Sequence, residues 1–114
     1  MQRRALSLAA AHLVLVSPIN TPFIASNLKE AEEELRRLIT RLDAREDLSF
    51  EDYHVAIAHM YHHLNTAWNG RYATDEQWRE CTDEDYEKWQ RFPKDLPMIG
   101  DDDYYDLPEY DAKT

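Results

Sequence analysis

The residues best suited to chemistry are four histidines that fall within one expected helix: His54, His59, His62 and His63. His59 and His63 are four residues apart, which places both imidazoles on one helical face at the spacing of two metal ligands. A third ligand would have to be a carboxylate of the preceding expected helix, from among Glu30, Glu32, Glu33 and Glu34. Metal binding by His59 and His63 is therefore one alternative function, with or without enzymatic activity.

The same histidines also suit a structural role. The glutamate of an H-E-x-x-H zinc protease is absent, and no second helix is rich in histidine. The face that carries His59 and His63 lies largely opposite the apolar stripe of its own helix, and the glutamates of the preceding helix alternate with arginines on a polar side. The preferred expectation is that the histidines are polar packing residues and that the protein uses no cofactor.

Other catalytic signatures are missing from the sequence. There is neither a G-x-S-x-G nucleophile elbow nor a G-x-x-x-x-G-K-[ST] phosphate loop, and Gly70 and Gly100 are the two glycines of the chain. Carboxylate pairs are plentiful because 23 residues are acidic, so their proximity alone identifies no acid–base pair. A non-enzymatic function is favoured over an enzymatic one.

An acidic segment rich in tyrosine forms the second candidate surface, near the C-terminus. The residues expected to contact a partner are Asp101, Asp102, Asp103, Tyr104, Tyr105, Asp106, Leu107 and Tyr110. Pro108 favours an extended backbone, from which rings can enter shallow pockets while carboxylates meet lysine and arginine. Packing of this segment on its own domain, or a role in solubility, are the alternatives.

The net charge of −10 is distributed unevenly along the chain. Residues 1–74 carry nine acidic and eight basic side chains, whereas residues 75–114 carry fourteen acidic and five basic ones. Nucleic-acid-binding proteins carry the opposite charge, so direct binding of DNA or RNA is excluded. A protein partner with a basic surface is the expected ligand.

These side chains are expected to be positioned by an all-α fold, a small bundle of about four helices with an irregular acidic C-terminal tail. A helical domain is expected over residues 1–94 and the tail over 95–114. The helices are predicted at residues 2–16, from Ser26 or Asn27 to about 44, from 49 to 70, and from 74 to 92. The last of these is either continuous or broken at Thr82, and Thr21-Pro22 is expected to interrupt the chain before the second.

The third predicted helix is the central one. Ser49 is its expected cap and Gly70 its end, and no charged residue lies between Asp52 and Arg71. A surface helix normally places charge on its outer side, so this helix is expected to be covered on more than one side. The cover would come from its own domain, from a larger protein, or from a second copy, which makes a homo-oligomer possible.

The first residues combine arginines with an apolar run from Ala5 to Val16, which has the outline of a targeting segment. No small-x-small cleavage site follows, and the run is too short to span a bilayer, so a core helix is expected rather than a strand or a targeting segment. With the single Cys81, this indicates a cytoplasmic protein without membrane association. The primary functional hypothesis is a non-enzymatic acidic interaction module of the inhibitor, immunity or nucleic-acid-mimic type.

Overall fold

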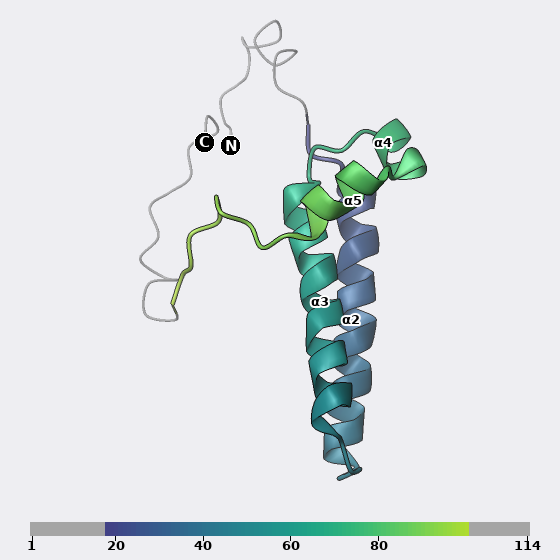
Figure 1. Cartoon of the computed structure of the whole chain (residues 1–114), viewed down its shortest axis with the longest axis vertical. Coiled ribbons are helices and arrows are strands. Elements are labelled where there is room, and N and C mark those ends of the chain that lie inside the picture. The colour runs from purple at the N-terminus through teal and green to yellow at the C-terminus, as the bar shows by residue number, and fades with distance from the viewer. Residues whose placement is uncertain (1–17, 101–114) are drawn as a thin grey trace, which may run out of the picture. The chain divides into compact units, whose positions relative to one another are not determined.

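The computed structural model describes residues 18–100, and residues 1–17 and 101–114 lie outside this range. Its helices are α2 (Thr21–Asp43), α3 (Phe50–Asn69), α4 (Asp75–Glu80) and α5 (Asp83–Gln90), and the described residues contain no strand. α2 and α3 form a long antiparallel hairpin, and the two short helices lie at one end of it (Figure 1). The predicted all-α small bundle is confirmed, while the helix expected at residues 2–16 and residues 101–114 of the expected acidic tail lie outside the described range.

One compact unit contains all four helices. It extends from Ile19 to Pro93, and Pro18 and residues 94–100 fall outside it. The boundary expected near residue 94 between a helical domain and a tail stays a prediction. None of the helices within residues 18–100 is long and apolar enough to cross a membrane.

α2 begins earlier than the sequence analysis predicts, at Thr21. Its cap is Asn20, whose side-chain oxygen accepts a hydrogen bond of 3.2 Å from a backbone N–H of the first turn. Pro22 therefore falls in that first turn, where N–H groups have no partner within the helix and a fixed φ favours helical backbone. The predicted interruption at Pro22 is wrong, and the predicted caps, Ser26 and Asn27, lie inside the helix.

α3 occupies the predicted segment. The side chain of Ser49 accepts a hydrogen bond from the backbone N–H of Asp52 at 3.0 Å. At the other end, the N–H of Gly70 donates to the carbonyl of Thr66 at 2.8 Å. Both predicted ends are confirmed because each depends on hydrogen bonds within one turn of the chain.

The fourth predicted segment is two helices rather than one. Thr74 and Gln77 form a reciprocal capping box at the start of α4, which ends at Cys81 with a left-handed backbone (φ 41°). The side chain of Thr82 then accepts a hydrogen bond from the N–H of Asp85 and starts α5. The chain thus turns at Cys81 and brings α5 back against α3.

The large aromatic side chains of the core gather at the end of the hairpin that α4 and α5 cover. Phe23 is 1% exposed, and its ring meets the rings of Trp78 and Trp89 edge to face, with centroid distances of 5.4 and 5.2 Å. Away from this end, the buried residues of α2 and α3 are smaller: Ala31, Leu38 and Ala56. Most of the aromatic burial that stabilises the fold is therefore concentrated near Phe23.

Two asparagines of α3 hold the C-terminal end of α5. The Asn65 side chain is buried and donates to the carbonyl of Gln90 at 2.9 Å, and Asn69 donates to the carbonyls of Trp89 (2.8 Å) and Arg91 (2.6 Å). The last carbonyls of a helix lack partners within the helix, so these amides satisfy them. The sequence placed both asparagines near the end of α3, and the contacts show that they cap α5.

Replacing Asn65 by alanine should lower the free energy of unfolding by about 1–3 kcal/mol, because a carbonyl of Gln90 would lose its buried donor. Urea unfolding followed by tryptophan fluorescence measures this change. Gln90→Ala is the matched control, since it removes a side chain and keeps the backbone carbonyl that accepts the bond. An equal loss in both variants would contradict the role given to the hydrogen bond.

Candidate functional site

A cluster of polar side chains lies on one side of the hairpin. Asn27, Glu30 and Glu34 lie three or four residues apart on α2, and His59 and His63 lie four apart on α3. Such spacings place side chains on one helical face, and the antiparallel pairing of the helices brings the two sets together. We call these five residues the polar cluster.

Each histidine of the polar cluster has a partner on α2. His59 Nδ1 lies 2.9 Å from Glu34 Oε1, and His63 Nδ1 lies 2.9 Å from Asn27 Oδ1. The second nitrogens of the two rings face each other, with His63 Nε2 3.2 Å from His59 Nε2. Both imidazoles are therefore oriented through Nδ1 and converge through Nε2.

Glu34 is the carboxylate that orients His59. Its side chain is 14% exposed, and Oε1 also accepts a hydrogen bond from Arg37 Nη1 at 3.0 Å. The hydrogen bond from His59 is the main cause that lowers the pKa of the Glu34 carboxyl, and the positive charge of Arg37 adds to it against the opposing effect of burial. Glu34 is consequently a carboxylate at neutral pH.

His63 is half-buried, whereas His59 is exposed. Burial lowers the pKa of His63, and the nearby His62 and His59 lower it further. Desolvation disfavours the imidazolium, so the neutral ring, with one nitrogen lone pair available, is the favoured form at neutral pH.

Glu30 is the carboxylate that approaches both converging rings. One ligand atom from each of Glu30, His59 and His63 can be chosen so that all three lie within 4.8 Å of one another. Of the other glutamates considered from the sequence, Glu32 pairs with Arg36 at 2.9 Å. The α2 glutamates share a polar side with arginines, as expected, and Glu30 and Glu34 of that side also approach the histidines of α3.

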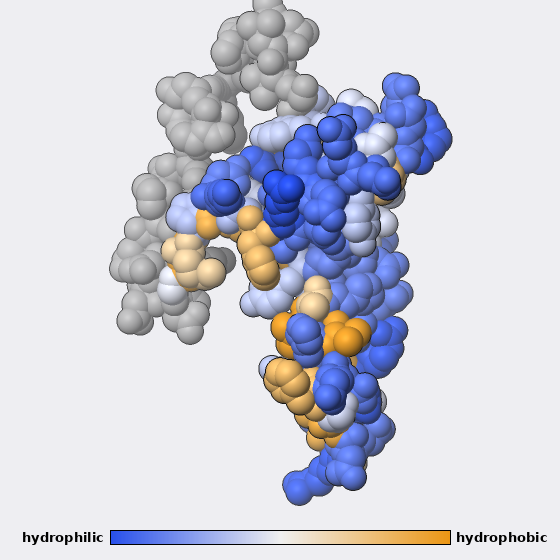
Figure 2. Space-filling view, in the orientation of Figure 1, coloured by the Kyte–Doolittle hydropathy of each residue, from blue (hydrophilic) through white to orange (hydrophobic). Residues whose placement is uncertain are grey.

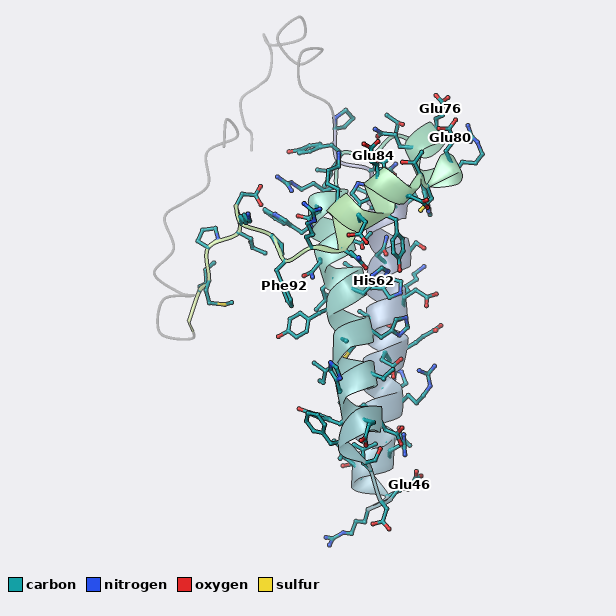
Figure 3. All side chains as sticks on the ribbon, viewed as in Figure 1. Glu46, His62, Glu76, Glu80, Glu84 and Phe92 are labelled. Carbon is teal, nitrogen blue, oxygen red and sulfur yellow. The ribbon has the colours of Figure 1, made fainter. Side chains whose placement is uncertain are left out.

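The remaining histidines of α3 are not part of this ligand group. The His54 ring stacks on Phe50, with a centroid distance of 6.1 Å. The His62 ring meets the His63 ring edge to face at 4.8 Å and lies 5.3 Å from the ring of Tyr86 on α5 (Figure 3). His62 therefore packs beside the pair, and the ligand atoms that come together are those of Glu30, His59 and His63.

A hydrophobic surface occupies the opposite side of the hairpin. Six large side chains there are each 44–51% exposed: Leu28, Leu35, Ile39, Leu42, Tyr53 and Leu64. On each helix they flank the buried seam on the side away from the polar cluster, as a period of 100° per residue requires. We call these six residues the apolar face. The side of the hairpin drawn in Figure 2 also carries hydrophobic surface below α4 and α5.

The structure also locates part of the acidic charge. Residues 75–90 carry seven acidic and two basic side chains, and Glu76, Glu80 and Glu84 are exposed at the α4–α5 end of the unit (Figure 3). The predicted partner-binding residues, Asp101 to Asp106, Leu107 and Tyr110, lie outside the described range. Their role stays a prediction.

The sequence indicates the histidine pair and includes Glu34 among its possible ligands, but it does not reveal that Glu34 and Asn27 orient the two imidazoles. Asn27 lies four residues after Phe23, and Glu34 lies four residues after Glu30. These spacings show only which α2 residues share a face, and they do not show which residues of α3 lie opposite. Comparison with known proteins adds no analogy, because no family model, curated protein or solved structure matches this chain.

Proposed function

We propose that this protein is a non-enzymatic, cytoplasmic interaction module that binds a basic protein partner through the apolar face of its α2–α3 hairpin. The observation that carries the proposal is the exposure of six large apolar side chains along two adjacent helices. Contiguous apolar surface of this kind is typical of protein-binding sites. An inhibitor or immunity-type role is the form of such binding that the small size and strong charge favour.

Charge supports a basic partner over a second copy. The whole chain carries −10, so two copies would repel each other, whereas a surface rich in lysine and arginine would be attracted. The occupant we propose is an amphipathic helix with an apolar stripe bordered by basic residues, which is the usual ligand of a helical groove. The acidic tail, with Asp101 to Asp103 and Tyr104, supplies further contacts to the basic border.

The test uses two substitutions that add the same charge on α2. Leu35→Glu changes the apolar face, and Thr40→Glu changes an exposed position outside it. Leu35→Glu should weaken partner binding about tenfold or more, whereas Thr40→Glu should leave it nearly unchanged. Both variants should retain the helical content of the wild type, since substitutions of exposed residues usually change stability by less than about 0.5 kcal/mol.

The partner is captured from the native host, identified, and then measured as a purified protein by calorimetry at two salt concentrations. Binding should weaken as salt increases, because screening reduces the attraction between the acidic chain and a basic surface. An acidic partner, equal binding by the two variants, or a wild-type dimer that Leu35→Glu dissociates would contradict the proposal. The last result would identify a second copy as the occupant.

A further inference from the structure

We propose that His59, His63 and Glu30 form a binding site for a divalent metal ion of the zinc type, between α2 and α3. This inference is independent of the proposed partner binding, since it concerns the opposite side of the hairpin. It rests on the convergence of the two imidazoles, on the hydrogen bonds that fix their tautomers, and on the carboxylate beside them.

The hydrogen bonds determine which nitrogen of His63 carries hydrogen. Asn27 Nδ2 donates to the backbone carbonyl of Phe23 at 3.1 Å, and a carbonyl can only accept. The amide oxygen of Asn27 therefore faces His63 and accepts a hydrogen bond from Nδ1–H at 2.9 Å. In the neutral ring, His63 Nε2 is left with a lone pair.

The hydrogen bond to Glu34 likewise determines which nitrogen of His59 carries hydrogen. Its Nδ1 faces the carboxylate of Glu34, which accepts hydrogen bonds and donates none, so Nδ1 carries the hydrogen. In the neutral ring, Nε2 of His59 also has a lone pair. Two lone pairs then point toward each other across 3.2 Å, which is unfavourable unless a cation lies between them.

The separation of the two nitrogens suits a metal ion. Two Zn–N bonds of about 2.0–2.1 Å at the tetrahedral angle place their nitrogens about 3.3 Å apart. The observed 3.2 Å between the Nε2 atoms is close to this value. Glu30 adds an oxygen donor, and two nitrogens with one oxygen are a ligand set that zinc and neighbouring transition metals accept.

The surrounding residues complete the arrangement. Metal-binding histidines generally donate their other N–H to a carboxylate or a carbonyl-type oxygen, and here Glu34 and Asn27 are those acceptors. His59 and Glu30 are exposed, so a fourth coordination position is open to solvent. The bound ion would join α2 to α3 near the middle of the hairpin.

The experiment measures Co²⁺ and Zn²⁺ uptake by the full chain after treatment with a chelator. Visible absorption reports tetrahedral Co²⁺, and calorimetry reports the stoichiometry and affinity of Zn²⁺. We expect one equivalent per chain at a site that the double variant His59→Ala/His63→Ala lacks. That variant retains every carboxylate, so ions held by the acidic segments remain in it and can be subtracted.

Two matched controls separate the site from general effects. The double variant His54→Ala/His62→Ala also lacks two histidines of α3, but it should still bind one equivalent of Zn²⁺ per chain. Glu30→Gln should weaken binding by at least about tenfold, and Asn27→Ala by about 10–100-fold, whereas Glu33→Gln should not. Circular dichroism verifies the helical content of each variant. If a histidine variant fails to fold, His59→Gln is used in its place, because His59 is exposed.

The proposal is overturned if the wild type binds no more Zn²⁺ at saturation than the double variant His59→Ala/His63→Ala does. It is also overturned if the two histidine double variants lose binding equally. Neither result affects the partner binding proposed above, which is measured with variants of Leu35 and Thr40.

Discussion

Replacing Phe23 by alanine should lower the free energy of unfolding by about 3–5 kcal/mol, which is the range for truncating a buried aromatic ring. Phe23 is 1% exposed, and its ring contacts both Trp78 and Trp89, so its loss would leave a cavity where α2 meets α4 and α5. A small domain is stabilised by only about 5–15 kcal/mol in total. The variant should therefore be partly unfolded at 37 °C.

Urea unfolding followed by circular dichroism measures the change. Phe50→Ala makes the same substitution at a residue that is 75% exposed, and it should alter stability by less than about 0.5 kcal/mol. If the two variants lost similar amounts of stability, the aromatic cluster around Phe23 would not be the centre of the core.

Replacing Gly70 by alanine should also destabilise the protein, by about 1–3 kcal/mol, because the added methyl group overpacks the core. A Cβ at this position would lie 2.6 Å from Phe23 Cε2 and 2.8 Å from Cζ, and 3.1 Å from the carbonyl oxygen of Thr66. Phe23 is enclosed by its neighbours and cannot withdraw freely. The backbone φ of −98° is accessible to alanine, so the clash with the ring determines the sign.

A double-mutant cycle tests this cause. Phe23→Leu removes the ring atoms nearest to Gly70, so Gly70→Ala should cost at least about 0.5 kcal/mol less in that background than in the wild type. Chemical denaturation of the four proteins gives the coupling energy. Additive losses, or a stabilising effect of Gly70→Ala alone, would show that the predicted contact with the Phe23 ring does not determine the outcome.

The sequence predicts best the features that depend on neighbouring residues. Ser49 with Asp52 and Gly70 defined α3 correctly, because caps are made within one turn. The start of α2 was missed for a related reason. Pro22 marks either a break or a first turn, and the presence of Asn20 as a cap determines which of the two occurs.

The candidate metal site could be predicted only in part. The spacing of His59 and His63 follows from one helix, but the approach of Glu30 and Glu34 requires the register between α2 and α3. The apolar pattern of each helix does not determine this register. Either flank of the apolar stripe of α2 could lie beside the histidines of α3. The apolar stripe likewise predicts which residues could be buried, and it does not show that Leu35 remains exposed.

Concentration of the large aromatic side chains at one end of the hairpin has a consequence for how the molecule opens. Amide hydrogen exchange should be slowest in the turns near Phe23 and Thr66 and progressively faster toward the connection at Arg45, because stability within a protein follows the local density of buried contacts. The hairpin would then fray from its connecting loop while the aromatic end stays closed. An ion bound midway along the hairpin would hold α2 and α3 together at a second point. Amide protection from exchange would then extend further toward the connecting loop.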